Sequence, residues 1–339
     1  MVKYSRSIGS KAGLILPLAG RVLSGYTNTN LHNMKKKIYA FLILLSTTLY
    51  TAAWAQSAGS GSGFEGILTV GISMAGVDLS QLAEVDYQGD VQQQAKEIFE
   101  KLPPQDMQKL QSTMEANPML GMVFMMTPSK GTIYLKNGVA VVKSSGLGFK
   151  IEHYHNQQAD EALLYTASLI EPGQAVTAAY KPSADQDKLF TEDKRITPEA
   201  FNITRTDETV TVAGYTCAKA IYTPKSDEPL AQSAPGMSAL QLRKLVLYTS
   251  NDVPKDINFS HPYYLPEGDG IMRIDLFFDD SDVPTMVYEI KSVEKTTVAD
   301  SLLQIQKTEP LYSLSDMDYG MQVLGIMMGG MGAFQVDED

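Results

Sequence analysis

Hydrophobic and polar residues alternate with a period of two along most of the chain after residue 130, the pattern of strands that bury one face. The alternation is clearest in two late segments, 270–278 and 285–294. On each of these predicted strands the apolar side chains share one face. They are Met272, Ile274, Leu276 and Phe278 on the first strand and Met286, Tyr288 and Ile290 on the second. We expect this face to line a core or a ligand-binding groove.

Further strands precede these two at short intervals. They are predicted at 64–73, 131–136, 139–144, 149–155, 162–169, 174–181, 201–207, 242–249 and, with a break at Ala213-Gly214, at 209–223. Asn137-Gly138 separates two of them and is the strongest hairpin signal in the chain. The order predicts a meandering antiparallel sheet, with loops at 181–198 and 223–236.

The hydrophobic period changes to that of a helix in two places. Two helices are predicted within about 90–116, ended by Pro103-Pro104 and by Asn117-Pro118. In the terminal segment 313–339, helical spacing relates Leu314, Met317, Met321, Leu324 and Met328. We expect a loosely attached helix and a disordered tip there, and an α+β fold in which a curved antiparallel sheet wraps over a few helices.

An export signal begins at Met34. Three lysines precede the short apolar run Ile38–Leu49, and Ala53-Trp54-Ala55 provides the small residues that signal peptidase requires. The signal therefore covers 34–55, with 1–33 interpreted as an over-long leader and 56–63 as a Gly/Ser linker. The apolar run is too short to span a bilayer. We expect a soluble periplasmic or secreted bacterial protein that does not span the membrane after cleavage near Ala55.

The charge of the chain limits its possible partners, and its cysteine content limits its possible disulfides. Removal of residues 1–55 takes seven basic residues and no acidic one, which leaves 21 Lys and Arg against 39 Asp and Glu, a net charge of −18. Nucleic acid is excluded as a partner, because its binding depends on neutralised phosphates. Cys217 is the only cysteine, so the chain forms no internal disulfide, and we expect a packed, inert thiol.

Three motifs suggest chemistry that the surrounding sequence does not favour. Residues 61–66 have G-x-G-x-x-G spacing, but a strand follows them where a dinucleotide site requires a helix. His153 and His155 share one strand face without a third ligand nearby, which favours a surface or structural role over a metal site. Asp279, Asp280 and Asp282 cluster in what we interpret as a solvated hairpin tip. No catalytic motif is present, so we expect neither an enzyme nor a cofactor.

Methionines gather in two patches that have two interpretations. The patches contain Met119, Met122, Met125 and Met126, and Met327, Met328 and Met331. Thioether sulfur favours Cu(I). Methionine also fills irregular apolar surfaces and suits variable lipophilic partners, and this second interpretation is favoured.

Three short stretches carry a resemblance to a known group of proteins. They are the opening Phe64-Glu65-Gly66, the segment Val212-Ala213-Gly214-Tyr215-Thr216-Cys217-Ala218-Lys219, and Pro284-Thr285-Met286-Val287-Tyr288-Glu289-Ile290 with the later Asp300-Ser301-Leu302-Leu303. Over 64–312 the chain resembles the LolA-like lipoprotein-carrier superfamily, nearest to the exported bacterial group "domain of unknown function 4412". The resemblance implies a half-open, curved sheet wrapped over helices, with an apolar concavity that holds acyl chains.

Three functions follow as hypotheses. The leading one is an exported binding protein that holds a lipid or lipoprotein acyl chain against the seven apolar side chains at 270–278 and 285–294. The second is an envelope protein that binds another exported protein through its loops and Met-rich terminal helix. The third is a Cu(I)-binding protein. The sequence points to no other metal and to no cofactor.

Overall fold

The computed structural model describes residues 64–116, 118–184, 199–225, 242–260 and 267–332. Within these residues the strands form one thirteen-stranded sheet in the order β13-β7-β6-β5-β4-β3-β1-β12-β11-β10-β9-β8, with β2 paired to β1. The strands are β1 Gly66–Met74, β2 Val77–Asp78, β3 Lys130–Lys136, β4 Val139–Ser145, β5 Phe149–Asn156, β6 Glu161–Ser168, β7 Ala175–Tyr180, β8 Phe201–Val212, β9 Tyr215–Pro224, β10 Lys244–Ser250, β11 Gly270–Phe277, β12 Met286–Glu294 and β13 Leu311–Tyr312.

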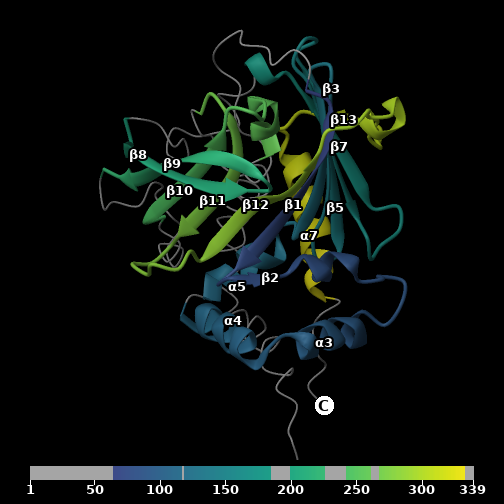
Figure 1. The fold of residues 1–339 in the computed structure, drawn as a ribbon. Coiled ribbons are helices and arrows are strands. Elements are labelled where there is room, and N and C mark those ends of the chain that lie inside the picture. The colour runs from purple at the N-terminus through teal and green to yellow at the C-terminus, as the bar shows by residue number, and fades with distance from the viewer. Residues whose placement is uncertain (1–63, 117, 185–198, 226–241, 261–266, 333–339) are drawn as a thin grey trace, which may run out of the picture.

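The sheet is antiparallel except where β13 runs parallel to β7. It is strongly curved and unclosed, with β3–β7 in one wing, β8–β12 in the other and β1 between them (Figure 1). Register shifts at Thr69/Val70, Tyr248/Thr249 and Arg205/Thr209 increase the local twist, as bulges do. The predicted α+β class is confirmed, as is the half-open, curved sheet over helices that the resemblance implies. The narrower assignment to group 4412 stays a prediction.

Turn chemistry explains where several strands end. Asn137 and Gly138 both have positive φ, so they form the tight hairpin turn that the sequence predicts between β3 and β4. Ala213 and Gly214 also have positive φ and separate β8 from β9. The sequence predicts separate strands at 201–207 and 209–223, whereas β8 continues across 208 through the bulge and ends at the turn.

Helices lie below one end of the sheet and inside its curve. The described helices are α3 Val91–Lys101, α4 Pro104–Ala116, α5 Pro118–Met125, α7 Met317–Gly332 and the 3-10 segments η2 Ser80–Glu84, η4 Lys255–Ser260 and η5 Asp300–Leu303. The two helices predicted within 90–116 are α3 and α4. The sequence analysis did not predict α5, which begins at Pro118, a residue whose fixed φ suits the first turn of a helix.

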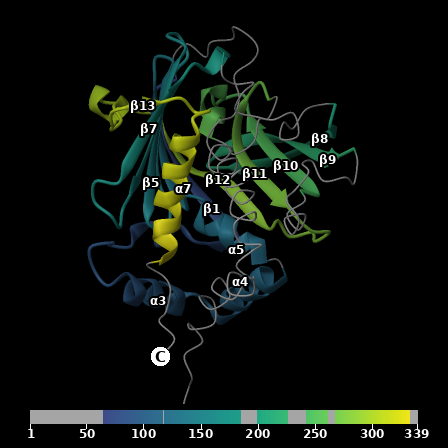
Figure 2. The same cartoon turned by 180° about the vertical axis from the view of Figure 1, so that it is seen from behind.

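The terminal helix α7 is firmly packed, which corrects the expectation of a loosely attached helix. It lies in the concavity of the wing formed by β5–β7 (Figure 2). Tyr319, Val323, Ile326 and Met327 are buried there in a second hydrophobic core with strand residues such as Phe149. Of the predicted stripe only Leu314 and Leu324 are buried, whereas Met317, Met321 and Met328 face outward. The expected stripe was wrong because the neighbouring face carries the aromatic and branched side chains. Residues 333–339 lie outside the described residues.

The segment between β12 and β13 is held against one wing by polar contacts. Lys136 Nζ donates to Val298 O at 2.9 Å, and Gln306 N donates to Glu152 Oε2 at 2.9 Å. Thr308 N donates to Thr177 Oγ1 at 2.8 Å. These bonds reach β3, β5 and β7 in turn, so the segment crosses the wing and delivers the chain to α7. Glu152 alternates with the inward His153 and therefore lies on the outer face.

Candidate ligand-binding cavity

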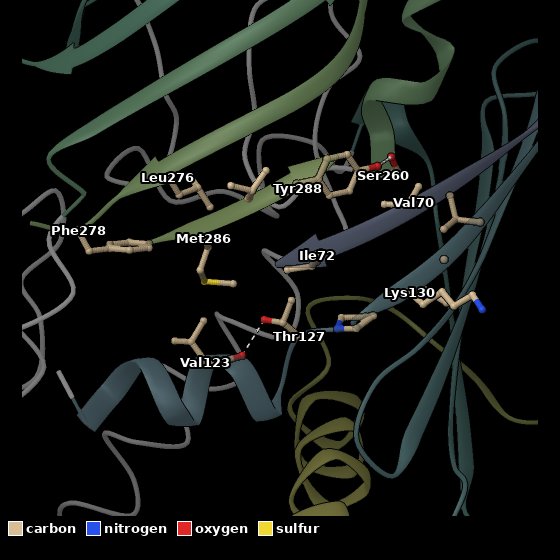
Figure 3. A pocket seen from close by; sticks show the side chains of 15 residues that line it. Val70, Ile72, Val123, Thr127, Lys130, Ser260, Leu276, Phe278, Met286 and Tyr288 are labelled. Atoms are coloured by element: carbon tan, nitrogen blue, oxygen red, sulfur yellow. Dashed lines mark hydrogen bonds between the residues drawn. The ribbon is translucent and has the colours of Figure 1, made fainter. Parts of the chain in front are cut away.

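An apolar cavity of about 80 Å³ lies where the two wings meet. Its walls come from β1, β11 and β12 on one side and from the end of α5 on the other (Figure 3). Val70 and Ile72 point inward from β1 because alternate residues of a strand share a face. Val123 closes the opposite side from α5. Apolar cavities accept apolar ligands.

All seven predicted binding residues belong to or pack against the first hydrophobic core, and four of them also line the cavity. Leu276, Phe278, Met286 and Tyr288 line the cavity. Met272, Ile274 and Ile290 are buried in the first hydrophobic core and do not line it. The division has a physical cause, because η4 packs on β11 and brings Ile257 and Phe259 into the same core. Only the end of this face that η4 leaves uncovered remains open to a ligand.

Four hydroxyl groups interrupt the apolar wall, and three of them donate their hydrogen to a main-chain carbonyl. Thr127 Oγ1 donates to Val123 O at 2.7 Å, and Ser260 Oγ donates to Ile257 O at 2.7 Å. Ser144 Oγ makes a longer bond of 3.5 Å to Ile151 O. Ser260 Oγ also lies 2.8 Å from Tyr288 Oη. Because the Ser260 hydroxyl donates its hydrogen to Ile257 O, Tyr288 is the donor in the bond between the two hydroxyls. Burial raises the pKa of the Tyr288 hydroxyl.

Lys130 is the one described cavity residue with a charged side chain. Its Nζ lies 2.6 Å from Glu84 Oε1, and Figure 3 shows the side chain directed away from the cavity. Both partners are largely exposed, so this ion pair contributes little stability. It nevertheless leaves the lysine's charge outside the cavity and matched by a carboxylate.

His153 and His155 lie on the concave face, buried beneath η4. His153 Nε2 is 2.7 Å from Tyr180 Oη, and the Phe259 ring packs against both imidazoles at centroid distances of 4.9 and 5.4 Å. Burial lowers the pKa of His153 to about 3, with His155 adding to the effect. Burial also lowers the pKa of His155 to about 4, opposed by Asp160. Of the surface and structural roles that the sequence left open, the pair has the structural one.

The remaining candidate motifs have structural explanations. Among the described residues no three His, Cys, Asp or Glu side chains come together as metal ligands. Cys217 is fully buried, and burial raises the pKa of its thiol, as expected for an inert cysteine. Asp279, Asp280 and Asp282 are exposed on the predicted hairpin tip. Residues 61–63 lie outside the described residues, and β1 follows them where a nucleotide site requires a helix.

One methionine of each patch is buried in the same core. Met126 and Met327 are both buried in the second hydrophobic core, whereas Met328 is partly exposed. This arrangement fits the use of methionine as an adaptable packing residue. Copper binding stays a prediction.

Sequence reasoning missed the floor of the cavity, which Val123, Thr127 and Pro128 form together. The available signal was the apolar run from Leu120 to Met126 after Pro118, which is compatible with a short buried helix. The methionines of this segment, three residues apart at 119, 122 and 125, indicated an adaptable apolar patch, with Cu(I) binding as the alternative, and not part of a helix that lines a cavity. Val142 and Ser144 of β4 were also missed, because period-two alternation shows that residues share a face but not which part of it stays open.

None of the described helices is long and apolar enough to cross a membrane. No family model matches the chain, and no curated protein matches it. Solved structures do match. PNGF-II in a P21 crystal is 11% identical, with a TM-score of 0.37, over 78% of this chain and 34% of that one. The chain spans about a third of the length of the first solved structures that it matches.

Two further matches cover most of the matched chain. LprF from Mycobacterium bovis is 13% identical, with a TM-score of 0.25, over 77% of this chain and 94% of that one. A domain from Vibrio parahaemolyticus, described as an outer membrane lipoprotein-sorting protein, is 7% identical, with a TM-score of 0.15, over 71% and 89%. All these TM-scores are below 0.5, so these matches carry no argument about the function of this chain.

Proposed function

We propose that this chain is an exported binding protein of the bacterial envelope, without catalytic activity, that holds a lipophilic ligand in the cavity between its two wings. The observation that carries the proposal is the cavity itself, whose walls are almost entirely apolar although it is open to a ligand from outside the core. Burial of apolar ligand surface there contributes about 25 cal/mol per Å². An acyl chain, of which only part would enter the cavity, is one ligand that suits such walls.

The position of the cavity supports a binding role. It lies between strands that the curved sheet brings together from both wings and the short helix α5, so its shape depends on the whole fold. Ligand sites are concave, mostly apolar and limited in polar groups, and this cavity has all three properties.

Native mass spectrometry with solvent extraction tests the proposal, with protein purified from the envelope of its own or a related bacterium. We expect a lipophile to copurify. An Ile72→Trp variant fills the cavity from a partly exposed position and should release it, whereas Val283→Trp, on the hairpin tip at 58% exposure, should retain it. A mass without ligand in the unmodified protein, confirmed by extraction, would contradict the proposal.

A second function is favoured by one separate observation. Met317, Met321 and Met328 are 75%, 40% and 37% exposed on the outward face of α7, an apolar stripe that suits an envelope protein partner. Cross-linking in cells separates the two functions. A specific cross-linked partner that is lost in Met317→Gln/Met321→Gln but kept in Ile72→Trp would support the interaction role.

A further inference from the structure

The polar groups around the cavity indicate the charge of its ligand. An anionic ligand needs N–H or O–H donors or a cation, because a buried carboxylate without partners is strongly destabilised. Three of the four wall hydroxyls already donate to carbonyl groups, from Thr127 to Val123, from Ser144 to Ile151 and from Ser260 to Ile257. The fourth, on Tyr288, is directed to Ser260 Oγ at 2.8 Å. Each therefore offers an incoming group only oxygen lone pairs.

The one cation among the described cavity residues is not available either. Lys130 pairs with Glu84 at 2.6 Å and points away from the cavity. A ligand carboxylate that reached this lysine would have to compete with Glu84 and would be repelled by it.

The edge of the cavity at Phe278 is acidic. Phe278 lines the cavity and is followed at once by Asp279 and Asp280, which are exposed with Asp282 on the same hairpin tip. The tip adds three carboxylates and no described basic residue at 279–285, although Lys244 Nζ of the neighbouring strand lies 4.0 Å from the centroid of the Phe277 ring. At about one Debye length, ~8 Å at physiological salt, such charges still affect an approaching anion. The cavity wall and the carboxylates of the tip therefore both disfavour anionic ligands.

We infer that the ligand is an uncharged lipophile, whose polar group, where it has one, is a hydrogen-bond donor such as an alcohol. This inference rests on the proposed function and adds the electrical character of the ligand. A hydroxyl ligand can donate to the lone pairs that the wall presents, whereas an ionised fatty acid meets only acceptors among the described wall hydroxyls. The head group is thus selected by hydrogen-bond polarity as well as by charge.

Competition between two ligands of equal chain length tests the inference. The purified protein is loaded with the neutral fluorescent probe N-phenyl-1-naphthylamine and titrated with 1-decanol or with decanoate at about pH 8, where a carboxyl group with an ordinary pKa near 4 is ionised. We expect 1-decanol to displace the probe and decanoate to bind at least about ten-fold more weakly, because its charge lacks a partner.

Two variants that each add one positive charge distinguish a local effect inside the cavity from a long-range electrostatic effect. Phe278→Lys places an ammonium group at a half-buried cavity position, and Val283→Lys places one on the exposed tip outside it. Phe278→Lys should reduce the preference for 1-decanol several-fold, and Val283→Lys should change it little.

The possible outcomes distinguish a failure of the uncharged-ligand inference from a failure of the proposed binding function. Decanoate that binds as tightly as 1-decanol to the unmodified protein would overturn the uncharged ligand and leave the binding function standing. A probe that neither binds nor is displaced by either competitor would overturn both. Equal effects of the two lysine variants would also contradict the inference, because the preference would then arise from long-range charge alone.

Discussion

The buried imidazoles of His153 and His155 couple the stability of the fold to pH. In the unfolded chain they protonate near their ordinary pKa of 6.5, whereas in the fold their pKa values are about 3 and about 4. Between these values the unfolded state binds more protons, so the free energy of unfolding falls as the pH falls. Each histidine contributes a slope of up to about 1.4 kcal/mol per pH unit.

Urea unfolding between about pH 7 and pH 5 measures this slope. A His155→Gln variant should lose less stability over that range than the unmodified protein. Gln158→His adds an imidazole at an exposed turn position and should leave the slope unchanged. An identical slope in His155→Gln and the unmodified protein would show that this histidine does not stay neutral in the fold.

Substitution by alanine is expected to have opposite effects on stability at two glycines. A Cβ at Gly325 meets nothing within 4 Å on the outward face of α7, so Gly325→Ala should stabilise the protein by about 0.5–1 kcal/mol through helix propensity. A Cβ at Gly146 would overlap the buried ring of Phe149, so Gly146→Ala should destabilise it by about 1–3 kcal/mol. Thermal melts of both variants decide the signs, and a stabilised Gly146→Ala would contradict the packing described for Phe149.

At the scale of elements, α7 is part of the core and not an appendage. Deletion after Tyr312 removes Tyr319, Val323, Ile326 and Met327, each buried against β5–β7 or their neighbours. Fully buried side chains of this size stabilise a fold by about 1.5–3 kcal/mol each, so the loss is comparable with a typical total stability of ~5–15 kcal/mol. We expect the truncated protein to lose its cooperative thermal transition. An intact transition, followed by circular dichroism, would show that the wing folds without α7.

The same helix shows what the sequence could and could not predict. Strands that bury one face were predictable, because alternation is local and the turn at Asn137-Gly138 fixes its own register. The buried face of α7 could not be predicted. Methionines line one face of this helix and branched or aromatic side chains line the next, and only tertiary packing decides which face is buried. The cavity was predictable in part. Leu276 and Met286 share a face with Ile274, but Ile274 is buried in the core and does not line the cavity. The segment η4, which packs on β11, leaves no periodic signal in the sequence.

At the scale of the whole molecule, the cavity joins parts of the sheet that are distant in sequence. Ile72, Val142 and Met286 line it from β1, β4 and β12, and Val123 adds α5. A bound ligand therefore contacts both wings and a helix at once. Because it binds only where these parts are assembled, occupancy should stabilise the fold as a unit and not a single strand.

Thermal unfolding in the presence of 1-decanol measures this linkage. A ligand at 100 times its Kd adds about 2.7 kcal/mol to the free energy of unfolding, which for a domain of this size corresponds to a Tm increase of roughly 5–10 °C. The increase should grow with the logarithm of the 1-decanol concentration and should disappear in Ile72→Trp, whose cavity is filled. Val283→Trp, which is exposed outside the cavity, should keep it. Equal increases in both variants would place the binding site elsewhere on the molecule, because only the first change occupies the space between the wings.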